Sequence, residues 1–186
     1  KKAAGLDIQM LLPLHGFVWR QDLGYILGKY DLWSRYEPEQ RGVVIAYASV
    51  YGGTENAANI LACRLREQGV QVEMFDTSVT PASYILAAAF RFSHVVLAAP
   101  TYNGGVFVTM ENLLHDLTAH GLKGRRAAYI ENGSWAPTSA RGMQKLLEPL
   151  NWETAADTVT LRSALRQGQQ EDLERMAMQL AESVKA

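Results

Sequence analysis

The chain has 186 residues, of which 48% are hydrophobic and 20% are charged, and its formal net charge at pH 7 is −1. This length and composition fit one globular domain with an extension and exclude a disordered chain. The near-neutral charge argues against a general nucleic-acid-binding protein, which is normally basic, and no apolar run reaches the length of a membrane span. A single cysteine, Cys63, excludes an internal disulfide framework and favours a reducing, cytoplasmic location.

The amino-terminal part of the chain differs from the remainder. Residues 6–14 predict a strand or a buried sheet edge, and His15 with the glycine after it predicts a turn. Residues 21–30 carry apolar side chains at helical spacing, and a polar connector extends from there to residue 42. Because this part is too small to fold alone, we expect residues 1–42 to be the tail of a preceding domain or a strap across the main one.

From residue 43 onwards, strand patterns alternate with helix patterns. Strands are expected at 43–48, 70–76, 94–100, 125–132 and 154–162, and helices at 55–68, 81–90, 106–120, 139–147 and 169–184. Pro81 is expected at the first position of its helix, after Thr80 as the cap, and Cys63 is expected as a small residue in the core or at its border. Strands that alternate with helices predict a doubly wound, five-stranded parallel sheet in a three-layer α/β/α sandwich.

The loop after the first strand is rich in hydroxyls and glycines. Residues 49–54 (SVYGGT) connect a buried strand to a helix, whose first amides lack internal partners and carry positive potential. Thr54 is a natural N-cap. The loop has neither the GxxxxGK[ST] nor the GxGxxG pattern, so it suits a terminal phosphate monoester held without a cationic side chain. The alternative is a strand-to-helix turn with a good cap.

Two further loops should meet the first one at the carboxyl ends of the parallel strands, where such sheets bind ligands. They are residues 100–105 and 132–137, and each carries glycine, a hydrogen-bonding residue and an aromatic side chain. We expect Tyr102 and Trp135 to lie near each other. Two flat side chains beside a phosphate pocket indicate a phosphate ester that carries a planar ring, although either aromatic residue alone could be surface packing.

The stretches YASVYGGTEN and APTYNGG, and the order of the elements, resemble the flavodoxin-like domain, which binds FMN, over residues 43–186. The resemblance implies that the first loop holds the phosphate and that the other two hold the flavin ring. The implied cofactor-binding residues are Ser49, Val50, Tyr51, Gly52, Gly53, Thr54, Pro100, Thr101, Tyr102, Asn103, Gly104, Gly105, Asn132, Gly133, Ser134 and Trp135.

The stretches LPLHGFVWR and KYDLWSRYEPEQRG resemble the junction of flavodiiron proteins, also called A-type flavoproteins. In that family a metallo-β-lactamase-like domain with two irons precedes the flavodoxin-like domain. The resemblance implies that His15 matches an iron ligand whose companions would lie upstream, and that residues 1–42 are the tail of that domain with its connector. Ala136 and Pro137 depart from the family, which often has a glycine-tryptophan pair there.

The resemblance implies an electron-transfer function. A small redox protein such as a rubredoxin would reduce the FMN, and a di-iron site in the full-length parent, in the same or a paired subunit of a homodimer, would reduce oxygen or nitric oxide. Two alternatives stay open: a stand-alone FMN-dependent NAD(P)H:quinone-type reductase, and an FMN-free interaction module. The residues offer no Ser-His-Asp or Cys-His set, and His94, His115 and His120 are not at metal-ligand spacing.

Overall fold

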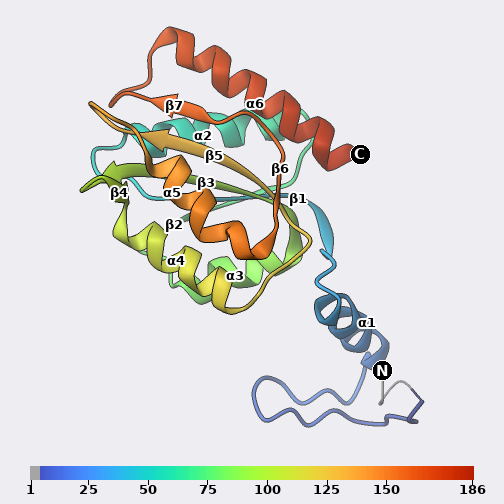
Figure 1. Cartoon of the computed structure of the whole chain (residues 1–186). Helices are drawn as coiled ribbons and strands as arrows, with labels where there is room; N and C mark the ends of the chain where they lie inside the picture. The colour runs from blue at the N-terminus through green and yellow to red at the C-terminus, as the bar shows by residue number, and fades with distance from the viewer. Residues whose placement is uncertain (1–4) are drawn as a thin grey trace.

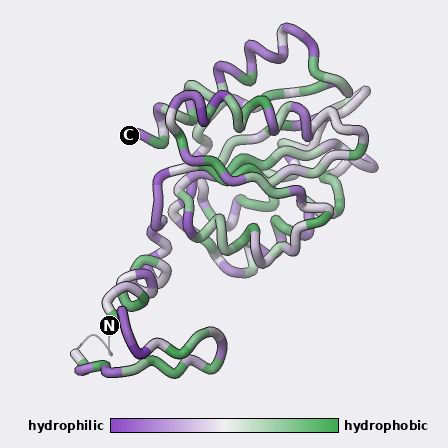
Figure 2. Tube along the Cα trace, turned by 180° about the vertical axis from the view of Figure 1, so that it is seen from behind, coloured by the Kyte–Doolittle hydropathy of each residue, from purple (hydrophilic) through white to green (hydrophobic). Residues whose placement is uncertain are grey.

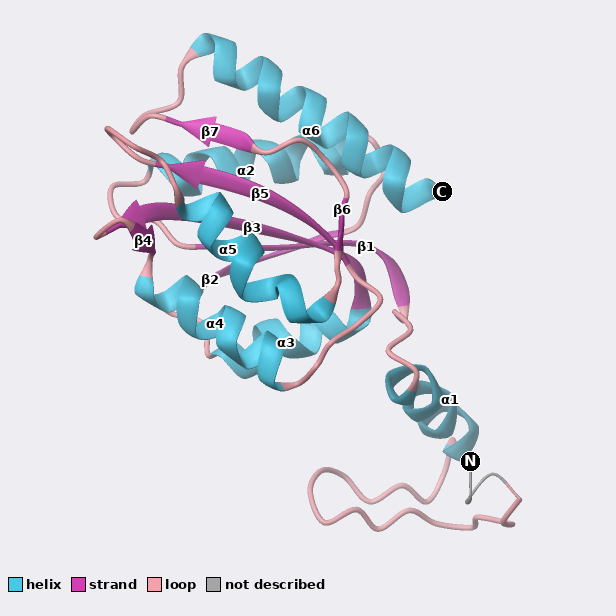
Figure 3. Cartoon of the chain, viewed as in Figure 1, coloured by secondary structure: helices cyan, strands magenta, loops and turns pink. Residues whose placement is uncertain are grey.

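The computed structural model describes residues 5–186. Figure 1 and Figure 3 show a central sheet with helices on both faces, and a separate amino-terminal part that stands away from it. The strands are β1 (Gln40–Tyr47), β2 (Val72–Asp76), β3 (Phe92–Tyr102), β4 (Gly105–Val106), β5 (Arg126–Asn132), β6 (Glu153–Thr154) and β7 (Val159–Leu161). The helices are α1 (Leu23–Ser34), α2 (Gly53–Glu67), α3 (Ala82–Arg91), α4 (Val108–Ala119), α5 (Ser139–Leu147) and α6 (Gln167–Lys185), with a 3-10 turn at Glu148–Leu150.

The sheet has the strand order β2-β1-β3-β5-β6, and these strands are parallel. β7 also pairs with β5, and β4 pairs antiparallel with β3. The predicted doubly wound α/β/α architecture is therefore confirmed. The expected strand at 154–162 is divided into β6 and β7, because the chain leaves the edge of β5 between them.

Alternate residues of the central strands enter two separate cores. Val43 and Ile45 of β1 pack under α2 and α6, whereas Val44 and Ala46 pack under the helices α3, α4 and α5. This burial on both faces explains why the central strands are continuously apolar rather than alternating. Figure 2 shows hydrophobic residues along the central strands, and hydrophilic and hydrophobic residues mixed along the helices around them.

Two predicted helix starts differ from the structure. α2 begins at Gly53, and Thr54 is a buried residue of its first turn rather than the cap. Pro81 precedes α3 instead of opening it, so Thr80 is not the cap of that helix. Cys63 is exposed on α2 rather than in the core or at its border.

The amino-terminal part does not form the strand expected at residues 6–14. Its only sheet-like pairing within the described chain is one bridge between Leu11 and Trp19. α1 starts and ends later than predicted and extends into the expected connector. Leu14 is 97% exposed and Phe17 is 83% exposed, although Trp19 of the same hairpin packs its ring 6.1 Å from that of Tyr25 in α1. Among residues 5–186, no helix is both long enough and apolar enough to cross a bilayer.

Candidate cofactor site

A cavity of about 400 Å³ lies beyond the carboxyl ends of β1, β3 and β5. This volume falls within the range typical of small-molecule sites. The residues that line it carry no formal charge, and they come from four loops: Ser49, Val50, Tyr51, Gly53, Thr54, Pro100, Thr101, Tyr102, Asn132, Gly133, Ser134, Ser163 and Ala164. The three loops predicted from the sequence therefore do converge on one site.

The first loop presents a set of uncharged donors to this cavity. The Ser49 hydroxyl accepts hydrogen bonds from the amides of Gly52 (3.1 Å) and Glu55 (3.3 Å), so its own proton remains available to a ligand. The amides of Gly53 and Thr54 have no acceptor among residues 5–186. Because they open α2, the helix dipole adds positive potential at these amides. This arrangement suits an anionic group.

The second loop contributes a hydroxyl of the same kind. Thr101 Oγ1, at the end of β3, accepts from the amides of Thr138 (2.8 Å) and Ser139 (3.1 Å) at the start of α5. Glu131 Oε2 accepts from the amide of Ala140 (3.1 Å), one residue further along the same helix. Strand-end side chains therefore cap α5 from a distance, and Thr101 keeps a proton that it can donate into the cavity.

Asn132 connects three of the four loops. Its side chain is almost fully buried, and its Nδ2 donates to Ser163 O (2.9 Å) and to Thr54 Oγ1 (3.3 Å). Its Oδ1 accepts from the amide of Ser163 (2.9 Å). Asn132 thus lines the cavity, but its hydrogen-bonding groups hold β5, the start of α2 and the loop after β7 together.

Gly53 and Ser163 approach each other closely at the same point. A Cβ atom added to Gly53 would lie 2.3 Å from the Ser163 carbonyl oxygen, so no larger residue fits without movement of the backbone. Ser163 itself has a left-handed φ of 66°. Glycine is therefore required here for packing within the protein.

Several predicted site residues do not line the cavity. Asn103 and Gly104 form the turn of a tight hairpin between β3 and β4, with positive φ at both residues, and the hairpin carries Gly105 away from the cavity. Such a turn matches the strong preference of Asn-Gly for type I′ hairpins. Tyr102 does line the cavity, and its ring packs edge-on against Phe107 at 5.6 Å.

Trp135 and Gly52 also lie outside the cavity lining. Trp135 is 93% exposed and makes no ring contact with Tyr102, so the expected pair of facing aromatic residues is not formed in this structure. The loop turns tightly here, since Pro137 lies 2.9 Å from where a Cβ on Gly133 would be, and Trp135 lies in its exposed part, residues 134–136. The cofactor-binding roles of these residues stay predictions.

Ser163 and Ala164 were not predicted from the sequence. They come after β7, so they lie at the same edge of the sheet as the other loops. The loop after β7 could have been predicted to border the site, because the rule that ligands bind at the carboxyl ends of parallel strands applies to the last strand as well.

His15 is exposed in the amino-terminal hairpin. Within residues 5–186, no group of three or more His, Cys, Asp or Glu side chains could hold a metal ion. His94 lies at the opposite end of the sheet from the cavity, where it is buried between the hydroxyls of Ser93 (2.8 Å) and Ser183 (2.9 Å). Burial and the nearby charges of Arg126 and Arg41 lower the pKa of His94 to about 4, so it is neutral at pH 7.

Comparison with known proteins identifies relatives of two kinds. No protein-family model matches the chain. A nitric oxide reductase of Moorella thermoacetica is 29% identical over 143 residues, which are 77% of this chain and 35% of that protein. Rubredoxin oxygen:oxidoreductase from Desulfovibrio gigas has a TM-score of 0.90 at 22% identity, over 99% of this chain and 46% of that one. A flavodoxin of Streptococcus pneumonia TIGR4 has a TM-score of 0.66 at 24% identity, over 76% of this chain and 98% of that one.

These likenesses show that the fold is flavodoxin-like, and they confirm the resemblance to flavodoxins and flavodiiron proteins that the sequence motifs predict. The chain spans less than half the length of the longer relatives, at 35% of the nitric oxide reductase and 46% of the rubredoxin oxygen:oxidoreductase.

Proposed function

We propose that this chain is an FMN-binding electron-transfer domain. The observation that carries the proposal is the cavity at the carboxyl ends of the strands, where the unpaired amides of Gly53 and Thr54 face a space bordered by Tyr102. The similarity to flavodoxins and flavodiiron proteins supports the same cofactor.

The donor set fits the phosphate of FMN. The two free amides and the hydroxyls of Ser49 and Thr54 can surround a dianion without a cationic side chain, as the α2 dipole favours. Thr54 Oγ1 accepts from Asn132, so its proton is also left for a ligand. Pro100, Thr101 and Tyr102 would border one side of the flavin ring, and Gly133 and Ser134 the other. FMN supplies the redox chemistry, and the protein binds and orients it.

Apolar side chains at the rim of the cavity would surround the flavin ring. Val50 is 49% exposed and Tyr102 is 48% exposed, and Tyr51 stands almost fully in solvent beside them. A planar ring seated among these side chains would remove apolar surface from water on both partners. The affinity for FMN would therefore combine phosphate recognition with burial of the ring.

The longer relatives suggest the wider role. We propose that residues 43–186 are the flavin domain and that residues 1–42 are the tail of a preceding domain with its connector. Two observations support this division: a complete flavodoxin corresponds to 76% of the chain, and the amino-terminal hairpin leaves apolar side chains such as Leu14 uncovered. A cytoplasmic parent would take electrons from a rubredoxin-like donor and deliver them to a di-iron site, in the same or a paired subunit, that reduces oxygen or nitric oxide.

The flavin content of the purified protein tests the proposal. We expect the absorption spectrum of bound flavin, reduction of that flavin by a reduced rubredoxin-like protein, and little reduction by NADH or NADPH alone. A protein that neither carries nor takes up FMN would be an interaction module. Rapid bleaching by a nicotinamide donor alone would identify a reductase instead.

The phosphate loop is tested separately by Ser49→Ala combined with Thr54→Val. Loss of two ligand-directed hydrogen bonds should weaken FMN binding by about tenfold to 100-fold. A matched control is Ser78→Ala with Thr158→Val, which makes the same chemical changes at two exposed residues outside the cavity. Equal affinities in the two double variants would contradict the assignment of the phosphate.

A further inference from the structure

The amino-terminal part meets the sheet domain at a short joint, residues 35–39, between α1 and β1. α1 contains no buried residue, so burial of an apolar face does not fix its orientation. Figure 1 shows the helix standing away from the sheet and connected to it only through this joint. Whatever orients the amino-terminal part must therefore act at the joint itself.

Arg125, just before β5, is the largest polar side chain buried near the joint, at 2% exposure. Its guanidinium donates only to backbone carbonyls, and no carboxylate pairs with it in the described chain. The acceptors are Ala89 O (from Nε, 2.7 Å), Phe90 O (from Nη2, 2.6 Å), and, from Nη1, Tyr36 O (2.6 Å), Lys123 O (3.0 Å) and Gly124 O (3.2 Å). One side chain thus connects the joint, α3 and β5.

A buried cation without a counter-ion is normally costly, and the location of Arg125 explains why it is tolerated. Ala89 and Phe90 belong to the last turn of α3, whose carbonyls lack helical partners and carry negative potential. Burial lowers the pKa of Arg125 to about 10, so the guanidinium remains protonated at neutral pH. All three of its nitrogens find acceptors, which makes the cluster rigid.

Tyr36 is the point at which this cluster holds the joint. It terminates α1 in a left-handed conformation (φ 59°), and the next amide, Glu37 N, returns to Leu32 O (3.0 Å). Its ring packs against Phe90 at 6.1 Å. Gly124 comes so close that an added Cβ would lie 3.1 Å from the Tyr36 carbonyl oxygen. Tyr36 is therefore fixed by its carbonyl, its ring and its backbone contact.

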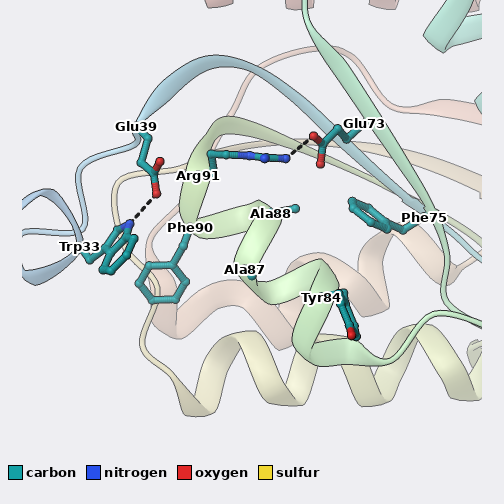
Figure 4. Close-up of a pocket in the computed structure, with 9 residues that line it drawn as sticks. All are labelled: Trp33, Glu39, Glu73, Phe75, Tyr84, Ala87, Ala88, Phe90 and Arg91. Atoms are coloured by element: carbon teal, nitrogen blue, oxygen red, sulfur yellow. Dashed lines mark hydrogen bonds and ion pairs between the residues drawn. The ribbon is translucent and has the colours of Figure 1, made fainter. Parts of the chain in front are cut away.

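Glu39 forms a second contact between α1 and the sheet domain. It accepts hydrogen bonds from Trp33 Nε1 (2.6 Å) and Lys29, both on α1, and its amide donates to Arg91 O (2.9 Å). Figure 4 shows Trp33 and Glu39 facing the end of α3. Burial alone would raise the pKa of Glu39, but the hydrogen bonds from Lys29 and Trp33 and the charges of Lys29 and Arg91 outweigh it and lower the pKa.

A cavity of about 730 Å³ lies beside these contacts, between Trp33, Phe90 and Tyr84. Arg91 crosses it to pair with Glu73, and Arg91 Nε is the one buried side-chain nitrogen or oxygen without a partner in residues 5–186. Side chains do not fill the space between α1 and α3. Apolar packing at the joint is therefore incomplete, and the hydrogen bonds of Arg125 and Glu39 are left to define its orientation.

We propose that Arg125 is a positioning residue that holds the amino-terminal part and the sheet domain in one fixed orientation. The chain would then move as one body rather than as two bodies on a flexible linker. A functional consequence rests on the proposed function: if FMN binds this domain, Arg125 sets the geometry between the flavin and the amino-terminal part. The joint itself requires no flavin.

Distances between two spin labels test this proposal without flavin. One label goes on the native Cys63, exposed on α2, and the other on Gly28→Cys in α1, where an added Cβ meets no atom within 4 Å. Double electron–electron resonance then gives the distribution of distances across the joint. We expect a narrow distribution in the labelled parent and one at least about twofold wider with Arg125→Gln, because the segments would sample several orientations.

The matched control is Arg126→Gln, which removes the same charge from the next residue, whose side chain points to Glu153 and Ser183. Its distribution should keep the parent width. If Arg125→Gln fails to fold, Arg125→Lys, which keeps the charge but loses the planar set of donors, should fold and give an intermediate width.

A width equal to that of the parent in a folded Arg125 variant would overturn the proposal, even if its Tm were lower. A lower Tm with no change in width would assign Arg125 to stability alone. FMN affinity, measured on the same proteins, should be unchanged by either variant. If the flavin proposal failed, the widths of the distance distributions would therefore still test the role of Arg125.

Discussion

The two ends of the sheet use their polar groups in opposite ways. At the carboxyl ends, the amides of Gly53 and Thr54 have no acceptor among residues 5–186 and border an uncharged cavity. At the amino ends, Arg125 and His94 are buried, and each of their ring or guanidinium nitrogens has a partner within the protein.

This contrast separates an end of the sheet that is suited to binding a ligand from an end that holds structural elements in place. Hydrogen-bond donors without a partner in a folded protein cost free energy unless water or a ligand accepts from them. The carboxyl end of the sheet is therefore suited to a ligand. Buried groups that are fully paired, such as those of Arg125 and His94, instead make one arrangement rigid, so they are suited to holding elements in place. Substitutions at the carboxyl end should therefore affect flavin affinity most, and those at the amino end should affect stability or orientation.

The largest effect is expected from Gly53→Ala. The new methyl group would meet the Ser163 carbonyl, so the loops around the cavity must separate. We expect FMN affinity to fall by about 100-fold or more, equivalent to about 3 kcal/mol, as measured by flavin fluorescence titration. Gly52→Ala is the control, since space around Gly52 is open and only its φ of 82° costs free energy, about 1 to 2 kcal/mol. A larger loss of FMN affinity with Gly52→Ala than with Gly53→Ala would contradict this prediction.

The next effect is a loss of stability in acid that depends on His94. Its folded-state pKa, about 4, lies below the ordinary value of 6.5, so protons bind preferentially to the unfolded chain between these values. The contribution to stability is complete above pH 6.5 and is lost as the pH falls towards 4, for a total of about 3 kcal/mol. Unfolding free energies from urea titrations should show this dependence, and His94→Gln should reduce it. An unchanged pH dependence in that variant would count against the assignment.

A smaller effect is expected from Asn132→Ala at the carboxyl end. The substitution removes the hydrogen bonds to Ser163 and Thr54, which should lower the free energy of unfolding by about 2 kcal/mol and weaken FMN binding by about tenfold. Asn59→Ala, on the exposed face of α2, is the control and should change neither quantity appreciably. Loss of stability without any loss of affinity would show that the loops hold the ligand independently of Asn132.

The smallest difference concerns the two aromatic residues. Tyr102 lines the cavity and Trp135 does not, so Tyr102→Ala should weaken FMN binding by about 1 kcal/mol, while Trp135→Ala should leave it nearly unchanged. Isothermal titration of both variants measures the difference. An equal or larger effect of Trp135→Ala would mean that its loop closes over the flavin on binding.

The fold could be predicted from the sequence because its signals are local. Apolar strands that alternate with helix-period segments indicate a parallel sheet, and a parallel sheet determines the edge at which the loops converge. The contacts of the site were harder to predict from the sequence where the interacting residues are far apart in the chain. Thr54 resembles a local cap, but its hydroxyl accepts from Asn132, and Ser49 supplies the cap instead. No local pattern reveals that Gly53 contacts Ser163.

The amino-terminal part shows the same limit. Residues 6–14 have the composition of a strand, yet composition does not provide a neighbouring strand, and the described chain offers Leu11 only one bridge. The role of Arg125 was equally hidden, because its acceptors are carbonyls contributed by the joint after α1, by α3 and by its own loop.

Binding of FMN and of riboflavin to the flavin-free protein tests the central claim most directly, since the two ligands share the ring and differ in the phosphate. Because the first loop offers free amides and hydroxyl protons to a dianion, FMN should bind at least about 100-fold more tightly than riboflavin. The difference should shrink in the Ser49→Ala, Thr54→Val protein. Equal affinity for the two flavins, or no binding of either, would contradict the account.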